Sequence, residues 1–259
     1  MCWSIFNPTG APLERQGEKP PACRLWGAPL TVCMMPPLRP KVIFFDAAGT
    51  LIHLPRGAAW HYREVALRHG VDIPEEQLSK AFRMAWKSTP PPTETRQARL
   101  DDDKSWWRGL VERVLDECGA AEEGRGTLFE SLYSEFEQPG VWELYPEVEE
   151  VLRDLAGDYR LAIISNFDRR LVRVLGHAGL SSCFEFVVLS SEVGADKPSP
   201  WIYEQALLKA GIPPGEALHV GDDPECDWRG AEAAGLQVFQ LDRPKNSLRE
   251  LVCALREGS

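Results

Sequence analysis

The sequence of 259 residues lacks long hydrophobic runs. No apolar stretch approaches the roughly 20 residues that a helix needs to span a bilayer. The N-terminus has neither the basic nor the apolar block of a secretion signal. These absences predict a cytoplasmic protein that has no membrane partner.

Positive charge is also in deficit. The chain has 29 Lys and Arg residues against 39 Asp and Glu residues, which gives a formal net charge of −10 and a pI near 5.1. An acidic surface repels the phosphate backbone on which non-specific nucleic-acid binding depends. Nucleic acid is therefore not an expected partner.

Paired cysteines are missing as well. No CxxC pair and no zinc-ligand spacing occurs among the seven cysteines, which is typical of reduced thiols in a cytoplasmic protein. The seven are Cys2, Cys23, Cys33, Cys118, Cys183, Cys226 and Cys253.

Proline, in contrast, is abundant in residues 1–40, which contain eight prolines. Proline interrupts both helices and sheet pairing, so this segment is predicted to be a disordered leader, with a Pro-rich binding arm as the alternative. Met34 and Met35 precede the first predicted strand, and either is a possible alternative start of the protein.

The remaining chain has the composition of a globular protein, with 44% hydrophobic and 26% charged residues overall. Residues 41–46 form a short apolar run that ends in Asp46, which predicts a buried parallel strand. Apolar residues then recur at helical spacing over residues 57–138, interrupted at the prolines 90–92. This pattern predicts an all-helical insertion with an internal loop.

From Tyr145 onward, predicted helices and strands alternate. The strands are expected at 160–164, 186–189, 217–220 and 237–241, and the helices at 146–155, 169–178, 202–210 and 228–234. Such alternation predicts an α/β fold with a doubly wound parallel sheet covered by helices on both faces. The predicted organisation is a leader at 1–40, an α/β core at 41–56 and 139–259, and the helical insertion at 57–138.

Polar residues follow four of the predicted strands. Ligands bind beyond the carboxyl ends of parallel strands, so we expect these residues in one crevice. Carboxylates grouped with a lysine are suited to a hard cation and a phosphoryl group. In chain order the residues are Asp46, Ser165, Asn166, Lys197, Asp222, Asp223 and Asp227.

These residues lie in four segments that resemble the motifs of the haloacid dehalogenase superfamily. The segments are FFDAAGTL at 44–51, ISN at 164–166, GADKPSP at 194–200 and HVGDDPECD at 219–227. The resemblance spans about residues 41–241 and implies a Rossmann-like core, with the helical insertion as a cap that closes over the crevice. ISNFDRRL at 164–171 and the Trp106–Trp107 pair further resemble a branch of eukaryotic dehalogenase-like hydrolases.

The resemblance implies the catalytic and metal-binding roles. Asp46 would attack phosphorus and form an aspartyl phosphate, which divides one difficult displacement into two. Asp222 would bind Mg²⁺ together with Asp46 and the backbone carbonyl of Ala48. Asp227 and Asp223 would support the metal. A structural alternative is that Asp222 and Asp227 cap the following helix.

The resemblance also implies the ligand-binding residues. Ser165, Asn166 and Lys197 would hold the phosphate oxygens of a small phosphorylated or otherwise activated metabolite. His219, within a predicted strand, is interpreted as a core histidine.

Ala48 departs from the phosphatase pattern. Family phosphatases place a second Asp there as general acid and base, and a methyl group transfers no proton. Loss of such a group costs about 10²- to 10⁴-fold in rate. His53, seven residues after Asp46, is a candidate substitute because histidine titrates near neutrality.

Three alternatives to a phosphatase follow from Ala48. A 2-haloacid dehalogenase also lacks the second Asp, but it loses the acidic metal residues that this chain keeps. A phosphonoacetaldehyde hydrolase has Ala there and uses a cap lysine, for which Lys80, Lys87 and Lys104 are candidates. A non-catalytic protein would bind a phosphate ligand without turnover. The sequence determines neither the substrate nor the oligomeric state.

Overall fold

The computed structural model describes residues 40–243 and 245–257. The predictions for the N-terminal leader and for a start at Met34 or Met35 lie outside these residues. In the part that is described, no helix combines the length and the apolar character that crossing a membrane requires.

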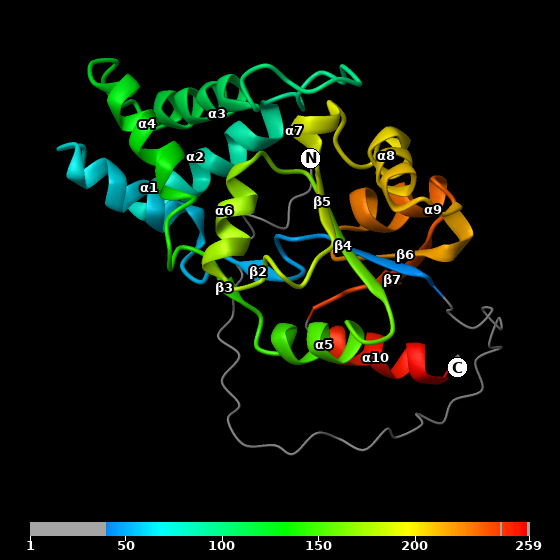
Figure 1. The fold of residues 1–259 in the computed structure, drawn as a ribbon. Coiled ribbons are helices and arrows are strands. Elements are labelled where there is room, and N and C mark those ends of the chain that lie inside the picture. The colour runs from blue at the N-terminus through cyan, green and yellow to red at the C-terminus, as the bar shows by residue number, and fades with distance from the viewer. Residues whose placement is uncertain (1–39, 244, 258–259) are drawn as a thin grey trace.

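A parallel sheet forms the centre of the fold (Figure 1). Its strand order is β5-β4-β1-β6-β7, and every neighbouring pair is parallel. The predicted α/β fold with a doubly wound sheet is therefore confirmed. The strands are β1 (Val42–Phe45), β4 (Arg160–Ser165), β5 (Phe186–Leu189), β6 (Ala217–Gly221) and β7 (Gln237–Gln240).

Alternate side chains of the strands point to opposite faces of the sheet, and each face has its own hydrophobic core. On one face, Ile43 and Phe45 belong to a cluster that includes α5 (Val148–Leu155), α6 (Arg170–His177) and α10 (Leu248–Glu257). On the other face, Val42 and Phe44 pack with α8 (Pro200–Ala210) and α9 (Gly230–Ala233). Burial on both faces explains why β1 is an uninterrupted apolar run.

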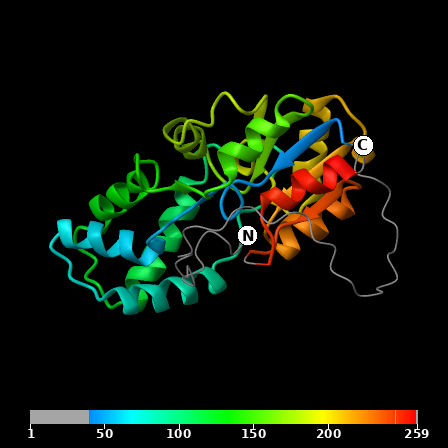
Figure 2. The same ribbon diagram turned by 90° about the horizontal axis from the view of Figure 1, so that it is seen from below.

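The segment between the first two sheet strands is helical, as predicted. It contains α1 (Gly57–Arg68), α2 (Glu75–Ser88), α3 (Lys104–Glu117) and α4 (Arg125–Glu135), here called the cap helices. Their apolar faces form a separate hydrophobic cluster, and Figure 2 shows them on one side of the molecule and the sheet on the other.

The two ends of the cap segment meet in a short antiparallel pair, β2 (Ile52–His53) with β3 (Glu143–Leu144). This pair was not predicted, because two-residue strands leave no periodic pattern in the sequence.

Four other elements differ from the prediction. The helix α10 was not anticipated, although Leu248, Leu251 and Leu255 have the spacing of a helix face. The helix expected at 228–234 begins earlier, as the π-helical turn η3 (Pro224–Arg229) that continues into α9, because Asp223 caps it. The loop 190–197 begins with the short helix α7 (Ser190–Val193), and the 3₁₀ turn η2 (Pro214–Glu216) precedes β6.

The described cysteines can be compared with the expectation of reduced thiols. Cys118 and Cys183 are free thiols. Cys226 is disulfide-bonded, which corrects the prediction for this residue. The spacing of cysteines along the sequence does not reveal which sulfur atoms meet in space.

Candidate active site

The carboxyl ends of β1, β4 and β6 bring the predicted residues together. Asp46 follows β1, Ser165 ends β4, and Asp222 follows β6. The Ser165 hydroxyl lies 3.5 Å from Asp46 Oδ1. Asp46 and Ser165 are both buried, with 6% and 2% of their surface exposed, so the sheet positions the nucleophile candidate where little water reaches it.

Lys197 is the centre of the charge network. Its Nζ donates to Asp46 Oδ1 at 2.5 Å, to Asp227 Oδ1 at 2.6 Å and to the carbonyl of Ile164 at 3.1 Å. Its side chain is fully buried. Burial lowers the pKa of Lys197, but the carboxylates of Asp227 and Asp46 outweigh burial and hold that pKa above its usual range. The lysine therefore carries a positive charge beside Asp46.

Asn166 fixes the backbone of this lysine. The Asn166 side chain accepts a hydrogen bond from the Lys197 backbone N–H at 2.6 Å and donates one to the Lys197 carbonyl at 2.9 Å. These two bonds occupy the side-chain oxygen and nitrogen. These contacts position the Lys197 backbone, and the predicted substrate-binding role of Asn166 stays a prediction.

Three carboxylates lie close enough together to hold one metal ion. Asp46, Asp222 and Asp227 each offer a ligand atom, and these atoms all lie within 4.8 Å of one another. Thr50, for which no role is predicted from the sequence, donates a hydrogen bond of 3.2 Å from Oγ1 to Asp222 Oδ1. Oxygen donors of this kind are the ligands that Mg²⁺ prefers.

The carboxylates repel one another when no cation neutralises them. Burial, opposed by Lys197 and reinforced by Asp227, raises the pKa of Asp46 from 3.8 to about 7. Burial and the charges of Asp46 and Asp227 raise the pKa of Asp222 well above 3.8. A divalent cation fits this site, because its positive charge would offset the burial of the carboxylates and their mutual repulsion.

Asp227 differs from the other two carboxylates. Burial raises its pKa, but Lys197 and His219 outweigh burial and bring that pKa below its usual range. His219 Nε2 lies 2.9 Å from Asp227 Oδ1, and the Asp223 N–H donates to Oδ2 at 3.0 Å. His219 is thus a direct partner of the site, and both Asp227 oxygens are already engaged.

Gly221 makes room for this arrangement. A Cβ at Gly221 would overlap Cγ of Asp227, so no larger residue fits there without a shift of the aspartate. The helix-capping role falls to Asp223, whose Oδ1 accepts from the N–H groups of Glu225 and Cys226. The alternative that Asp222 or Asp227 serves as the cap is therefore wrong.

Ala48 and His53 lie in the turn that follows Asp46. Ala48 is buried, with 2% exposed surface. His53 stacks on Tyr145 with ring centroids 4.6 Å apart. The pKa of His53 lies below its usual value, mainly because of burial. The positive charge of Arg243 also lowers this pKa, and the negative charge of Glu143 opposes the shift. A neutral imidazole at neutral pH follows, and its role as a substitute base stays a prediction.

The three cap lysines have ordinary surroundings. Lys80 and Lys87 are exposed on α2, and Lys104 forms an ion pair of 2.6 Å with Glu130. None of them is buried in an apolar setting.

A segment of the cap reaches back to the loop that carries Lys197. Residues 94–103, here called the strap, form backbone hydrogen bonds from Thr95 N–H and Arg96 N–H to the Gly194 carbonyl, at 2.8 and 3.2 Å. Arg99 pairs with Asp196 and with Asp103, each at 2.7 Å. The cap therefore contacts the residue next to Lys197.

The parallel sheet, with an aspartate–lysine site at its carboxyl edge, defines an α/β protein whose candidate active site lies beyond the strand ends. The chain belongs to the haloacid dehalogenase-like hydrolases, whose family model matches residues 40–235. The suspected resemblance is therefore confirmed. The human Haloacid dehalogenase-like hydrolase domain-containing protein 3 is 32% identical over 212 residues, which cover 80% of this chain and 84% of that protein.

Two further proteins are similar to this chain. Phosphoserine phosphatase from Thermus thermophilus is 36% identical over 146 residues, 54% of this chain and 57% of that protein. The HAD-hydrolase YfnB from Bacillus subtilis, solved bound to magnesium, has a TM-score of 0.70 at 17% identity and covers 84% of this chain and 99% of its own. At this level of identity, the similarity to YfnB shows a shared fold alone.

Proposed function

We propose that this chain is a Mg²⁺-dependent hydrolase of small phosphoryl compounds that acts through a covalent aspartyl phosphate on Asp46. The observation that carries the proposal is the placement of the Asp46 carboxylate, which is buried between the Ser165 hydroxyl and the Lys197 ammonium. The similarity to a phosphoserine phosphatase supports phosphoryl chemistry.

In the proposed reaction an oxygen of Asp46 attacks phosphorus and the bond from phosphorus to the leaving oxygen breaks. Lys197 and the Ser165 hydroxyl neutralise the phosphoryl oxygens as charge develops on them. Water then hydrolyses the aspartyl phosphate, which releases inorganic phosphate and restores Asp46. Asp227 keeps Lys197 oriented, and Asn166 holds its backbone.

The oxygen donors fit Mg²⁺. Asp46 and Asp222 would hold it together with the Ala48 carbonyl, and Asp227 would support the site from its contact with Lys197. When bound, the ion supplies positive charge that neutralises the carboxylates and the phosphoryl group.

We also propose that residues 57–138 form a cap domain on a core of residues 41–56 and 139–259. The separate hydrophobic cluster of the cap helices and the pairing of β2 with β3 at the ends of the insertion support this division. The strap then connects cap and core at the lysine loop.

Ala48 limits the substrates that react. An alkoxide leaving group needs a proton, and the alanine offers none, whereas a carboxylate or phenolate leaves unaided. Acyl and aryl phosphates should therefore react faster than sugar phosphates.

The test is hydrolysis of acetyl phosphate by wild type and by Asp46→Asn, with and without Mg²⁺. Wild type should turn over only with Mg²⁺, and the variant should lose at least about 10³-fold in rate, because no second nucleophile replaces the carboxylate. Mass spectrometry after acid quenching should find one phosphoryl group on Asp46. Asp154→Asn, a change at a surface carboxylate paired with Arg256, is the matched control and should not affect turnover.

Phosphate binding without turnover would contradict the proposal and identify a non-catalytic binding protein. Equal rates for wild type and Asp46→Asn would show that another residue is the nucleophile.

A further inference from the structure

Arg243 lies in the loop that follows β7 and contacts three separate parts of the chain. Its Nη1 lies 2.6 Å from Oε1 of Glu147. Its Nη2 donates a hydrogen bond of 3.1 Å to the carbonyl of Thr50, which is 193 positions away. The centre of the guanidinium lies 3.7 Å from the centroid of the Tyr145 ring. A planar guanidinium can make these contacts together, because its nitrogens point in fixed directions while its face stacks on the ring.

The loop that carries Arg243 is fixed to the strand next to the candidate active site. The N–H of Leu241 donates to the carbonyl of Gly221, the last residue of β6, at 3.0 Å. The Asn246 side chain accepts a hydrogen bond of 2.7 Å from the Asp242 N–H and so closes the loop. Arg243 is therefore presented from a defined position beside β6.

Tyr145 and Glu147 lie where the chain re-enters the core from the cap segment. The Tyr145 N–H donates to the Leu51 carbonyl at 3.1 Å. The Glu147 side chain is 5% exposed, and a carboxylate buried to this degree is tolerated when a cation pairs with it. Arg243 supplies that cation. Through Thr50 and Tyr145 it contacts both crossings of the chain between core and cap.

Thr50 connects Arg243 to the candidate metal site. Thr50 has no exposed surface. Its carbonyl accepts the hydrogen bond from Arg243, and its Oγ1 donates to Asp222 Oδ1 at 3.2 Å. Ala48, whose carbonyl is a proposed ligand of Mg²⁺, lies two positions earlier in the same turn. A residue that fixes the Thr50 carbonyl therefore also sets the direction of the Thr50 hydroxyl and of this turn.

We propose that Arg243 is a positioning residue for the metal site. It holds Thr50, and Thr50 holds Asp222 in the orientation that binds the cation. The inference rests on the proposed function, since it concerns the affinity of the proposed site for Mg²⁺. Replacement of a residue that orients a metal ligand typically costs about 10- to 100-fold in metal affinity or activity. Arg243 acts through Thr50 and is not itself a ligand.

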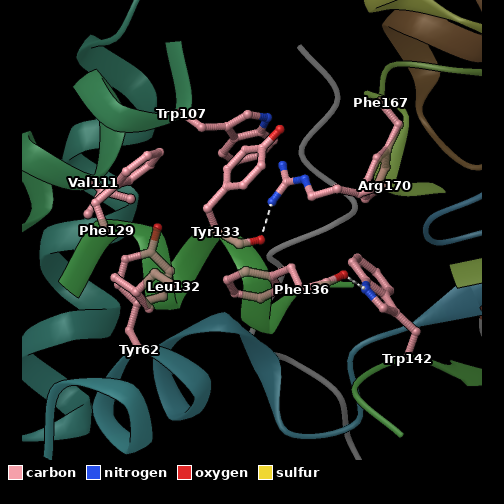
Figure 3. Close-up of a pocket in the computed structure, with 10 residues that line it drawn as sticks. All are labelled: Tyr62, Trp107, Val111, Phe129, Leu132, Tyr133, Phe136, Trp142, Phe167 and Arg170. Atoms are coloured by element: carbon pink, nitrogen blue, oxygen red, sulfur yellow. Dashed lines mark hydrogen bonds between the residues drawn. The ribbon is translucent and has the colours of Figure 1, made fainter. Parts of the chain in front are cut away.

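A second arginine provides a matched comparison within the same molecule. Arg170 pairs with Asp168 at 2.6 Å and donates to the Tyr133 carbonyl at 2.9 Å, between the cap helices and the start of α6 (Figure 3). Its guanidinium also lies 3.7 Å from a tyrosine ring centroid, that of Tyr133. Both arginines thus combine an acid, a carbonyl and a ring, but the carbonyl that Arg243 holds belongs to Thr50.

The experiment measures Mg²⁺ binding by isothermal titration calorimetry, without substrate. Arg243→Lys keeps a cation beside Glu147, but one ammonium group does not reproduce the fork that also holds the Thr50 carbonyl. The Kd for Mg²⁺ should therefore rise about tenfold. At saturating Mg²⁺, kcat of this variant with acetyl phosphate should return close to the wild-type value. Arg170→Lys is the control and should keep the wild-type Kd.

A double-variant cycle tests whether Arg243 acts through Thr50. Thr50→Val removes the hydroxyl that bonds Asp222 and should weaken Mg²⁺ binding at least as much as Arg243→Lys. The double variant should then bind Mg²⁺ about as weakly as Thr50→Val alone, because the effects of residues in one chain of contacts are not additive.

Thermal unfolding checks that each variant is folded. If Arg243→Lys does not fold, Arg243→Gln combined with Glu147→Gln replaces it, because this pair of changes leaves no buried charge without a partner. The same rise in the Kd for Mg²⁺ is expected.

Separate outcomes contradict the two proposals. A wild-type protein that binds no Mg²⁺ would contradict the proposed function and this inference with it. Mg²⁺ binding in the wild type with an unchanged Kd in a folded Arg243 variant would overturn the inference alone. An equal loss of affinity in Arg170→Lys, or fully additive losses in the double variant, would also overturn it, because the effect would then not pass through Thr50.

Discussion

Lys197 is charged and has no solvent exposure, and its Nζ donates to Asp46, Asp227 and the Ile164 carbonyl. An ammonium group in such a place is tolerated because each of its hydrogens has an acceptor. The same bonds prevent the lysine from moving away from Asp46. Asp227 thus contacts the site mainly through the lysine, and Asp46 and Asp222 are the carboxylates that we propose as cation ligands.

Ala48 leads to a prediction about rate. Ala48→Asp should restore an acid and base next to the nucleophile and raise the rate with alkyl phosphates by about 10²- to 10⁴-fold. Wild type should show a steep dependence on leaving-group pKa and a burst of product with aryl phosphates, because both half-reactions lack proton transfer. Rapid-mixing kinetics with a graded series of aryl phosphates measures both effects.

Ala48→Asn is the control for this prediction, since it has nearly the same shape as Asp but transfers no proton. Equal gains from Asp and Asn would mean that size rather than acidity matters. A flat leaving-group dependence in wild type would show that another residue supplies the proton. If His53 is that residue, His53→Ala should slow release of the aspartyl phosphate.

At the level of elements, the strap is held in a strained conformation. The described residues with positive φ other than glycine are Arg96, Asp102 and Asp103, all within the strap. Such conformations persist only where surrounding contacts stabilise them. The contacts come from the loop 190–196, including the bond of 2.6 Å from the Ser191 hydroxyl to Asp102. Cap position and lysine loop are therefore physically coupled.

Gly194 tests this coupling. A Cβ there would overlap the Gln97 carbonyl oxygen, and its φ is +69°, so Gly194→Ala should detach the strap. Trypsin should then cleave after Arg96 or Arg99 at least about tenfold faster, because a detached loop is open to proteolysis. Acetyl phosphate turnover should fall as the lysine loop loses its support.

Gly211→Ala is the matched control. Gly211 has a similar φ of +70° at the end of α8, but no atom lies within 4 Å of the position that an alanine methyl group would take. Both variants should lose about 1–2 kcal/mol of stability from the left-handed backbone alone. Faster cleavage in both variants, or in neither, would contradict the inference that the close contact at Gly194 holds the strap in place.

For the molecule as a whole, the acidic site makes stability depend on pH and on metal. The folded-state pKa values of Asp46 and Asp222 lie above the unfolded value of 3.8, with Asp46 at about 7. Between these values the folded state binds more protons than the unfolded state, so the free energy of unfolding without metal should decrease as pH rises from about 4 to about 7. Metal binding requires the deprotonated carboxylates.

We therefore expect Mg²⁺ to raise the unfolding temperature more at pH 8 than at pH 6. Thermal unfolding with and without Mg²⁺ at about 10 mM, roughly a hundredfold above a dissociation constant of order 0.1 mM, should show a gain of about 2.7 kcal/mol at saturation. Asp222→Ala should lose this gain. Equal shifts in the variant and in wild type would contradict the metal assignment, and Glu225→Ala, at an exposed residue of η3, is the control.

Much of this molecule follows from its sequence. The apolar run before Asp46 and the later alternation of helices and strands predict a parallel sheet, because both patterns reflect local periodicity and burial. The polar residues after the strands meet because the carboxyl ends of parallel strands share one edge. Lys197 and Asp222 were placed in the candidate site for this reason, and the structure brings them there.

Only the tertiary structure decides how the cap meets the core. Arg99 and Asp196 are 97 positions apart, and Tyr133 and Arg170 are 37 apart. No local period links them, because their contact depends on how the whole insertion folds back over the sheet. The contact between Asn166 and Lys197 also depends on the tertiary structure. The sequence near Asn166 does not indicate that its amide side chain will bond the backbone of a lysine 31 positions away.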